Sequence, residues 1–324
     1  MWVGHSCLLF RRSGTLPDTA RQGASPTREN VGSFTQEGKL EFKNMDLGNL
    51  QIYSIVENSF KIDGGAMFGV VPKILWQKYV PADKDNFITL DINLLLVRSQ
   101  DKNILIDTGT GDTLTKKQKE MFGVEKPSNL DRGLKNLGLS PEDIDIIVLS
   151  HLHADHSGGV VKLDKDGNKI PHFPDARHYV QKQEWEDANN PDERTSATYL
   201  VETLMLLKQN NLLQLVDGEK EIVTGVMVSN SHGHTSGHQI VWINGGREKV
   251  IYAADIIPTT AHLRAAYVAS VDLYPKETMQ IKKEIIRKCL EQNWMLALDH
   301  DVNTKLCRLK QEDGRIVFEK VEFK

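Results

Sequence analysis

Cysteine is scarce in this sequence. The 324 residues include three cysteines, Cys7, Cys289 and Cys307, which are too few and too widely spaced for a disulfide framework. A fold held together by disulfides is therefore excluded, and the low cysteine content predicts a reducing, cytoplasmic location.

The sequence also lacks an excess of positive charge and any long hydrophobic run. The formal net charge is −4 at pH 7, which offers no basic surface to nucleic acid or to an anionic membrane. No apolar run approaches the roughly 18 residues that a membrane span needs. The remaining composition, 40% hydrophobic and 26% charged residues, is ordinary for a soluble globular enzyme. We therefore expect neither nucleic acid nor a membrane as a partner.

The first 44 residues lack the periodic patterns of the rest of the chain. The short apolar patch Met1–Phe10 is followed, not preceded, by two arginines, an order that is wrong for a secretory signal. Residues 12–40 are rich in Ser, Thr, Gly, Gln and Arg without periodicity, which predicts disorder. The sequence thus divides into a disordered extension, 1–44, and a folded domain, 45–324.

Against these absences stands one dense cluster of metal-binding residue types. The stretch Ser150–Gly159 reads S-H-L-H-A-D-H-S-G-G and follows an apolar run, 144–149, that is typical of a buried strand. Four side chains that suit zinc and its neighbours lie within six positions of this stretch: His151, His153, Asp155 and His156. The alternative is a merely polar turn, but 11 histidines in 324 residues make such a cluster improbable by chance.

Three later strands also end in a metal-ligand side chain. His234 lies in S-N-S-H-G-H-T-S-G-H, Asp255 follows the apolar run K-V-I-Y-A-A, and His300 follows W-M-L-A-L-D. Each alone would be read as an ordinary hydrogen-bonded histidine or a capping carboxylate. Because strand ends gather on one rim of a sandwich, the five histidines and two aspartates together predict a site for two metal ions.

The apolar and turn patterns predict an α/β fold with many strands and few helices. Strands are expected at 47–56, 87–97, 103–107, 144–149, 176–180, 212–216, 225–229, 239–243, 249–253, 295–298, 306–309 and 316–323. Helices are expected at 130–137, 198–210 and 275–290. This order favours two stacked sheets, each covered by helices on its outer face, over one parallel sheet.

The order of these motifs resembles the metallo-β-lactamase superfamily over residues 45–324. The carrying residues are H-x-H-x-D-H at 151–156, G-H-T-x-G-H at 233–238, the aspartate Asp255 after an apolar strand, and the late His300. The resemblance implies an αββα sandwich of two mixed sheets flanked by helices, with a dinuclear metal site at one edge.

Carried over position by position, the resemblance also implies a role for each ligand. His151, His153 and His234 would hold one metal ion; Asp155, His156 and His300 would hold the other; and Asp255 would bridge them. Asp107 resembles the family's aspartate that orients a ligand histidine, and His238 resembles a residue lying behind the ligands. The cofactors implied are two divalent ions, zinc first, with manganese, cobalt or iron as alternatives.

The segment 63–76, D-G-G-A-M-F-G-V-V-P-K-I-L-W, is similar to the quorum-quenching N-acyl-homoserine lactonases and to the methyl-parathion-hydrolase-like branch. Its glycines and proline predict neither a helix nor a regular strand. Met67, Phe68 and Trp76 are expected to line an apolar substrate cleft; the alternative is a loop folded over the core. The resemblance implies a hydrolase that opens lactone rings with a metal-bridging hydroxide, so its partner would be a small-molecule lactone or ester. A homodimer is one option for its assembly.

One departure concerns the group that polarises the ring ester. Several such lactonases have a tyrosine three positions after the bridging aspartate, where this chain has Pro258. Tyr267 or His262 takes over this role, or the metal ions act unaided, and Asp155 or Asp255 carries the proton to the leaving alkoxide.

Other functions remain as alternatives. The same site suits phosphotriester or other ester hydrolysis. A di-iron redox protein is disfavoured because 324 residues hold no flavin module, and a binding module is disfavoured because all seven ligands are present. His232 is either a substrate contact or a polar loop residue.

Overall fold

The computed structural model describes residues 43–324, which lie in one compact unit, Phe42–Lys324. The disordered extension expected at 1–44 therefore lies outside the described residues, apart from its last two positions. The first sheet of this unit has seven strands in the order β1-β2-β3-β4-β5-β8-β9. Their bounds are β1 Met45–Asp46, β2 Gln51–Asp63, β3 Phe87–Arg98, β4 Asn103–Ile106, β5 Ile146–Val148, β8 Arg177–Gln181 and β9 Leu213–Val216.

The second sheet also has seven strands, and they follow one another in sequence order from β10 to β16. Their bounds are β10 Lys220–Val223, β11 Val226–Asn230, β12 Gln239–Asn244, β13 Lys249–Tyr252, β14 Met295–Ala297, β15 Leu306–Glu312 and β16 Arg315–Lys320. A separate pair, β6 (Val161–Leu163) and β7 (Lys169–Pro171), forms a small ribbon after the histidine stretch.

The two large sheets pack face to face over an apolar layer. Ile52, Val97 and Ile104 from the first sheet share one buried cluster with Val241 and Val250 from the second. These side chains alternate with residues that point to the opposite face of their strands, as the period of a strand requires. Each fully buried side chain of this kind contributes about 1.5–3 kcal/mol of hydrophobic stabilisation.

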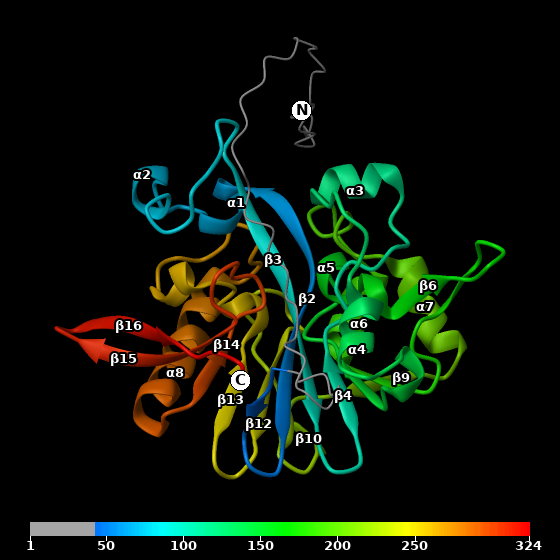
Figure 1. Ribbon diagram of the computed structural model, residues 1–324. Coiled ribbons are helices and arrows are strands. Elements are labelled where there is room, and N and C mark those ends of the chain that lie inside the picture. The colour runs from blue at the N-terminus through cyan, green and yellow to red at the C-terminus, as the bar shows by residue number, and fades with distance from the viewer. Residues whose placement is uncertain (1–42) are drawn as a thin grey trace, which may run out of the picture. The chain divides into compact units, whose positions relative to one another are not determined.

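Helices cover the outer face of each sheet (Figure 1). Leu134 of α4 (Leu130–Asn136) and Leu207 of α7 (Val201–Gln209) pack on the first sheet. Ile285 of α8 (Pro275–Gln292) packs on the second. The layer order is therefore helix, sheet, sheet, helix, which confirms the αββα sandwich expected from the sequence. Within residues 43–324, no helix has both the length and the apolar character needed to cross a bilayer.

Some elements differ from the sequence prediction. The segment 63–76 contains two short helices, α1 (Gly64–Phe68) and α2 (Lys73–Trp76), because Asp63 caps the first by accepting a hydrogen bond from Gly65 N. The prediction of irregular structure there was wrong in this respect. Three further helices were not expected from the sequence: α3 (Lys116–Phe122), α5 (Ala154–Ser157) and α6 (Lys182–Asn189).

The reason is clearest for α3. It buries no side chain, so no apolar stripe reveals it, and a capping box between Thr115 and Gln118 starts it instead.

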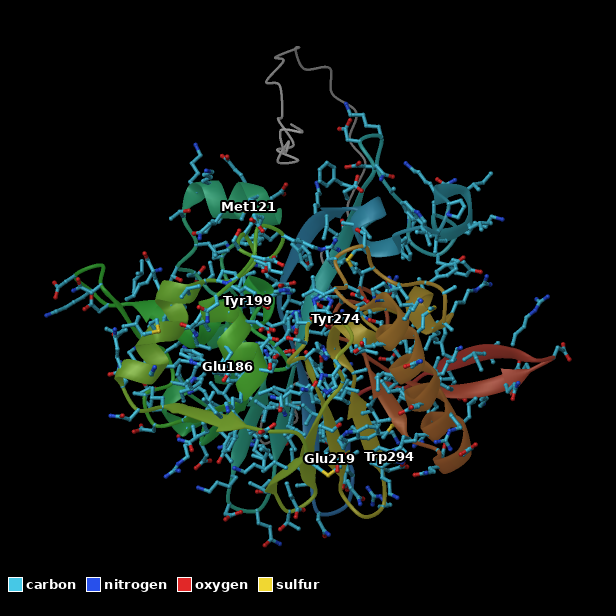
Figure 2. All side chains as sticks on the ribbon, turned by 180° about the vertical axis from the view of Figure 1, so that it is seen from behind. Met121, Glu186, Tyr199, Glu219, Tyr274 and Trp294 are labelled. Atoms are coloured by element: carbon cyan, nitrogen blue, oxygen red, sulfur yellow. The ribbon has the colours of Figure 1, made fainter. Side chains whose placement is uncertain are left out.

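Seen from behind, Met121 of α3 marks one end of the unit and Glu219 and Trp294 mark the other (Figure 2). Tyr199 and Tyr274 lie at a level between these ends.

Candidate metal centre

The candidate ligands gather because strands from both sheets end on one rim. In the second sheet β13 pairs parallel to β14, and β11 runs in the same direction because two antiparallel pairings separate it from β13. The segments after these three strands carry His234, Asp255 and His300. In the first sheet β4 and β5 are also parallel, and their ends lead to Asp107 and His151. Strand direction therefore brings four distant parts of the chain together.

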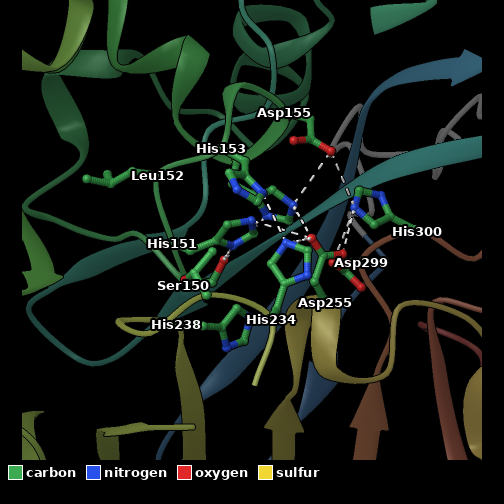
Figure 3. Close-up of polar contacts among 12 residues, drawn as sticks. Ser150, His151, Leu152, His153, Asp155, His234, His238, Asp255, Asp299 and His300 are labelled. Atoms are coloured by element: carbon green, nitrogen blue, oxygen red, sulfur yellow. Dashed lines mark hydrogen bonds and ion pairs between the residues drawn. The ribbon is translucent and has the colours of Figure 1, made fainter. Parts of the chain in front are cut away.

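The first group of donors combines three imidazoles with one carboxylate. Ligand atoms of His151, His153, His234 and Asp255 all lie within 4.8 Å of one another. Asp255 Oδ2 lies 3.1 Å from His234 Nε2 and 3.4 Å from His151 Nε2, and His153 Nδ1 lies 3.0 Å from His234 Nε2 (Figure 3). Nitrogen donors crowded around one carboxylate oxygen are the arrangement that a zinc-type ion requires.

The second group shares Asp255 with the first. His156, Asp255, Asp299 and His300 also present ligand atoms within 4.8 Å of one another. Asp255 Oδ2 lies 3.4 Å from His156 Nε2, whereas its Oδ1 lies 3.3 Å from His300 Nε2. Asp155 is adjacent, with Oδ2 3.7 Å from His156 Nε2 and 3.6 Å from His300 Nε2. The structure therefore brings together all seven side chains that the sequence singled out, and it adds Asp299.

These residues fit a divalent cation on chemical grounds. The Nε2 atoms of His151 and His156 are buried and have no hydrogen-bond partner in the described part of the chain. A buried polar atom without a partner is costly, so nitrogens aimed at a shared carboxylate are better explained by a bound ion. Imidazole and carboxylate donors suit zinc, manganese, cobalt and iron.

Other side chains fix the orientation of the ligand imidazoles. Asp107 Oδ2 lies 2.9 Å from His156 Nδ1, and Ser150 N donates to Asp107 Oδ1 at 2.7 Å. Asp272 Oδ1 lies 2.8 Å from His234 Nδ1, a contact that was not expected from the sequence. With Nδ1 held in this way, the Nε2 atoms of His156 and His234 face the centre of the site.

Glu184 joins the two histidine-bearing loops. Its Oε1 accepts a hydrogen bond from Leu152 N at 3.0 Å, and its Oε2 accepts one from Thr235 Oγ1 at 2.5 Å. Tyr199 OH donates to the same carboxylate at 3.3 Å, and the Tyr199 ring lies 5.3 Å from that of His153. Glu184 is fully buried, and nothing in its local sequence distinguishes it from a solvent-exposed helical glutamate.

Burial and neighbouring charges shift the pKa values of the imidazoles in the first group in opposite directions. Burial lowers the pKa of His151 and of His153 well below the usual range for histidine. Burial also opposes protonation of His234, but Asp255 and Asp272 outweigh it and raise the pKa of His234 to about 9. In the metal-free protein, protonated His234 therefore balances the buried carboxylates.

In the second group, nearby carboxylates also raise the pKa values of the histidines. Burial is outweighed at His156, where Asp155 and Asp107 raise the pKa well above its usual value. It is also outweighed at His300, where Asp299 contributes most to raising the pKa to about 10. A cation that binds here replaces these protons, so binding is expected to release them.

The aromatic side chains expected in a cleft are buried instead. Met67, Phe68 and Trp76 are at most 5% exposed, and the Phe68 ring stacks on Trp76 at 4.8 Å. On its other side Phe68 stacks on His262, also at 4.8 Å. This packing is compatible with a loop folded over the core, and a role of these side chains in an apolar substrate cleft stays a prediction.

The candidate polarising groups and the remaining histidines have mostly structural contacts. His262 receives a hydrogen bond from Thr259 Oγ1 at Nδ1 (2.8 Å) and donates from Nε2 to Met67 O (2.8 Å). Tyr267 is buried with its ring edge-on to Phe68. His232 is exposed and its Nδ1 lies 2.9 Å from the carbonyl oxygen of Ser236, as expected for a loop residue.

His238 lies behind the first group of donors. Its Nδ1 lies 2.6 Å from Ser231 Oγ, and its ring centroid lies 5.2 Å from that of His151. It belongs to neither of the two donor groups within residues 43–324.

Comparison with known proteins supports the same fold. Residues 89–291 match the Metallo-beta-lactamase superfamily, which is more than half of the chain. The curated N-acyl homoserine lactonase of a Bacillus species is 30% identical over 166 residues, 48% of this chain and 59% of that protein. N-acyl homoserine lactonase AiiB of Agrobacterium fabrum is 30% identical over 172 residues, with the same two coverages. The match thus spans less than two thirds of the length of these relatives.

Two solved structures extend the likeness across the domain. A probable metal-dependent hydrolase from Staphylococcus aureus superposes with a TM-score of 0.78 and 33% identity, covering 86% of this chain and 99% of that one. AidC, described as a dizinc quorum-quenching lactonase, superposes with a TM-score of 0.72 at 24% identity, covering 87% and 98%, and supports the fold alone. The chain belongs to the metallo-β-lactamase superfamily.

Proposed function

We propose that this protein is a dinuclear metal-dependent hydrolase that opens lactone rings, with N-acyl-homoserine lactones as its substrates. The curated relatives named above are N-acyl homoserine lactonases, and each matches this chain at 30% identity. We extend this activity to the present protein because its two donor groups at the rim of the sandwich suit a pair of metal ions.

The observation that carries the proposal is the position of Asp255. Its Oδ2 faces His151, His156 and His234, and its Oδ1 faces His300, so one carboxylate serves both groups of donors. His151, His153, His234 and Asp255 would hold one ion, and Asp155, His156, His300 and Asp255 would hold the other. When bound, a pair of divalent ions supplies Lewis acidity, which favours hydroxide over water at neutral pH and stabilises an oxyanion.

The protein's own residues then orient the substrate and move the proton. Ring opening breaks the bond between the carbonyl carbon and the ring oxygen, and the leaving alkoxide must receive a proton. Asp155 suits this transfer because its side chain is 27% exposed, whereas that of Asp255 is 11% exposed and surrounded by imidazoles. Asp155 is thus the carboxylate that substrate and solvent can reach.

The test is a lactone-opening assay that follows proton release after reconstitution with zinc, manganese or cobalt. The metal-loaded protein should open a long-chain N-acyl-homoserine lactone, and Asp255→Asn should reduce kcat/KM by about 10²-fold or more. Asp131→Asn, a change at a surface carboxylate paired with His172, should leave the rate unchanged. A loaded protein that opens no lactone, or that prefers an aryl phosphotriester, contradicts the proposal.

A cytoplasmic location belongs to the same proposal. Cys289 and Cys307 are free thiols buried in the core between α8 and the second sheet, which agrees with a reducing compartment.

A further inference from the structure

Asp299 is a buried carboxylate with no hydrogen bond of its own. It lies between the end of β14 and His300, and it is 2% exposed. Neither Oδ1 nor Oδ2 accepts a hydrogen bond from any residue in the range 43–324. The backbone of this residue is nevertheless fixed, because its carbonyl oxygen accepts a hydrogen bond from Asn93 N at 2.7 Å.

The carboxylate is directed at the second group of donors. Its Oδ2 lies 3.5 Å from His300 Nε2, and its ligand atom lies within 4.8 Å of those of His156, Asp255 and His300. Figure 3 shows Asp299 beside Asp255 and His300, on the side away from Asp155. Asp155 is partly exposed, whereas Asp299 is not. The two carboxylates therefore approach the same position from the solvent side and from the interior.

A comparison within the same loop argues against a role for Asp299 in holding the fold. Two residues later, the Asp301 carboxylate accepts hydrogen bonds from the backbone nitrogens of Thr260, Asn303 and Thr304 at 2.7–2.9 Å. Asp301 thus has the contacts of a structural aspartate. Burying a carboxylate costs several kcal/mol unless it is paired or coordinates a metal. Asp299 accepts no hydrogen bond that offsets this cost, and its one ion-pair contact, His300 Nε2 at 3.5 Å, is itself a candidate ligand.

We propose that Asp299 is an additional ligand for the ion held by His156, His300 and Asp255, so that this ion has a carboxylate from each side. This inference rests on the proposed metal centre and goes beyond the seven ligands that the family resemblance implies. The two positions then differ in chemistry: the first has three imidazoles and one carboxylate, and the second has two imidazoles and three carboxylates. Carboxylate-rich sites suit manganese better than imidazole-rich sites do, so the second position is expected to accept Mn²⁺ more readily.

The experiment counts bound ions and does not depend on turnover. Wild type and Asp299→Asn are loaded with Mn²⁺ or Zn²⁺, dialysed against graded chelator and analysed for metal per chain. Wild type should hold two ions, and the variant should lose the second at a chelator concentration at least about tenfold lower. Asp131→Asn, which removes a surface charge that belongs to neither donor group, should behave as wild type.

Thermal unfolding of the metal-free proteins separates a ligand from a structural residue. Because the Asp299 carboxylate accepts no hydrogen bond and its ion-pair partner His300 also contacts Asp255, Asp299→Asn should melt at nearly the same temperature as wild type, whereas Asp301→Asn should melt lower. Equal affinity of wild type and Asp299→Asn for both ions would overturn the inference. So would loss of the metal-free fold in both Asp299→Asn and Asp299→Ser. A wild type that binds two ions yet opens no lactone contradicts only the proposed activity.

Discussion

Asp107 and His156 are joined at the base of the candidate metal centre, with Asp107 Oδ2 2.9 Å from His156 Nδ1. Asp107 adopts the left-handed backbone conformation (φ 58°), which is uncommon for a residue with a side chain. Ser150 and the Tyr252 hydroxyl, the latter at 2.9 Å, donate to the same carboxylate and hold it in place. The unfavourable backbone conformation of Asp107 thus occurs at the residue that orients the candidate ligand His156.

The first prediction concerns this contact. Asp107→Asn should weaken the ion at the second position by about 10–100-fold, because the amide no longer fixes the imidazole of His156 as a carboxylate does. The ion at the first position should be unaffected. Metal competition with a chromophoric chelator measures both affinities. Tyr252→Phe, which removes one donor to Asp107 without touching His156, is the control and should have the smaller effect.

The second prediction concerns the corresponding contact in the first donor group. Asp272 Oδ1 lies 2.8 Å from His234 Nδ1, so Asp272→Asn should weaken the ion at the first position by a similar factor of about 10–100. Chelator competition should then give the opposite order of release from that of Asp107→Asn. The same order of release in both variants would contradict the assignment of these two aspartates to different ions.

The sequence identified the seven candidate ligands because each follows a strand whose apolar pattern is unambiguous. It did not predict Asp272, which lies in an irregular stretch before α8 where no period indicates a direction. Asp299 was missed because β14 ends at Ala297, so strand alternation no longer tells which of the next side chains turns inward. The helix α6 was missed because its sequence, K-Q-E-W-E-D-A-N, is mostly polar, and Glu184 within it is buried by tertiary contacts alone.

The third prediction concerns the close approach of two loops below the centre. A Cβ on Gly159 would lie 2.2 Å from the backbone oxygen of Thr108, where no side chain can move aside. Gly159→Ala should therefore lower the free energy of unfolding by about 2 kcal/mol or more, as overpacking does. Gly138→Ala is a useful control, since its Cβ would meet nothing within 4 Å and only the positive φ of 72° opposes it. Chemical denaturation of both variants measures the difference, and equal losses would contradict the steric explanation.

The last prediction is a pH dependence that arises outside the ligand set. Glu57 is fully buried beneath the loop 109–111, where its carboxylate accepts hydrogen bonds from Thr110 N and Gly111 N, both at 3.3 Å. Burial outweighs these hydrogen bonds and raises the pKa of Glu57 to about 7 from its usual 4.5. The folded protein then binds a proton more tightly than the unfolded chain does, so stability is greatest below pH 4.5 as far as this group is concerned.

As the pH rises from 4.5 to about 7, this contribution should be lost, and it should stay constant above that range. The shift corresponds to about 3 kcal/mol. Glu57→Gln, which keeps the shape and cannot ionise, should abolish this part of the pH dependence and should be more stable than wild type at pH 8. Urea denaturation between pH 4.5 and 8, with chelator present so that metal binding does not contribute, measures the effect. Parallel curves for the two proteins would show that Glu57 stays ionised in the fold, because the surrounding N–H groups then outweigh its burial.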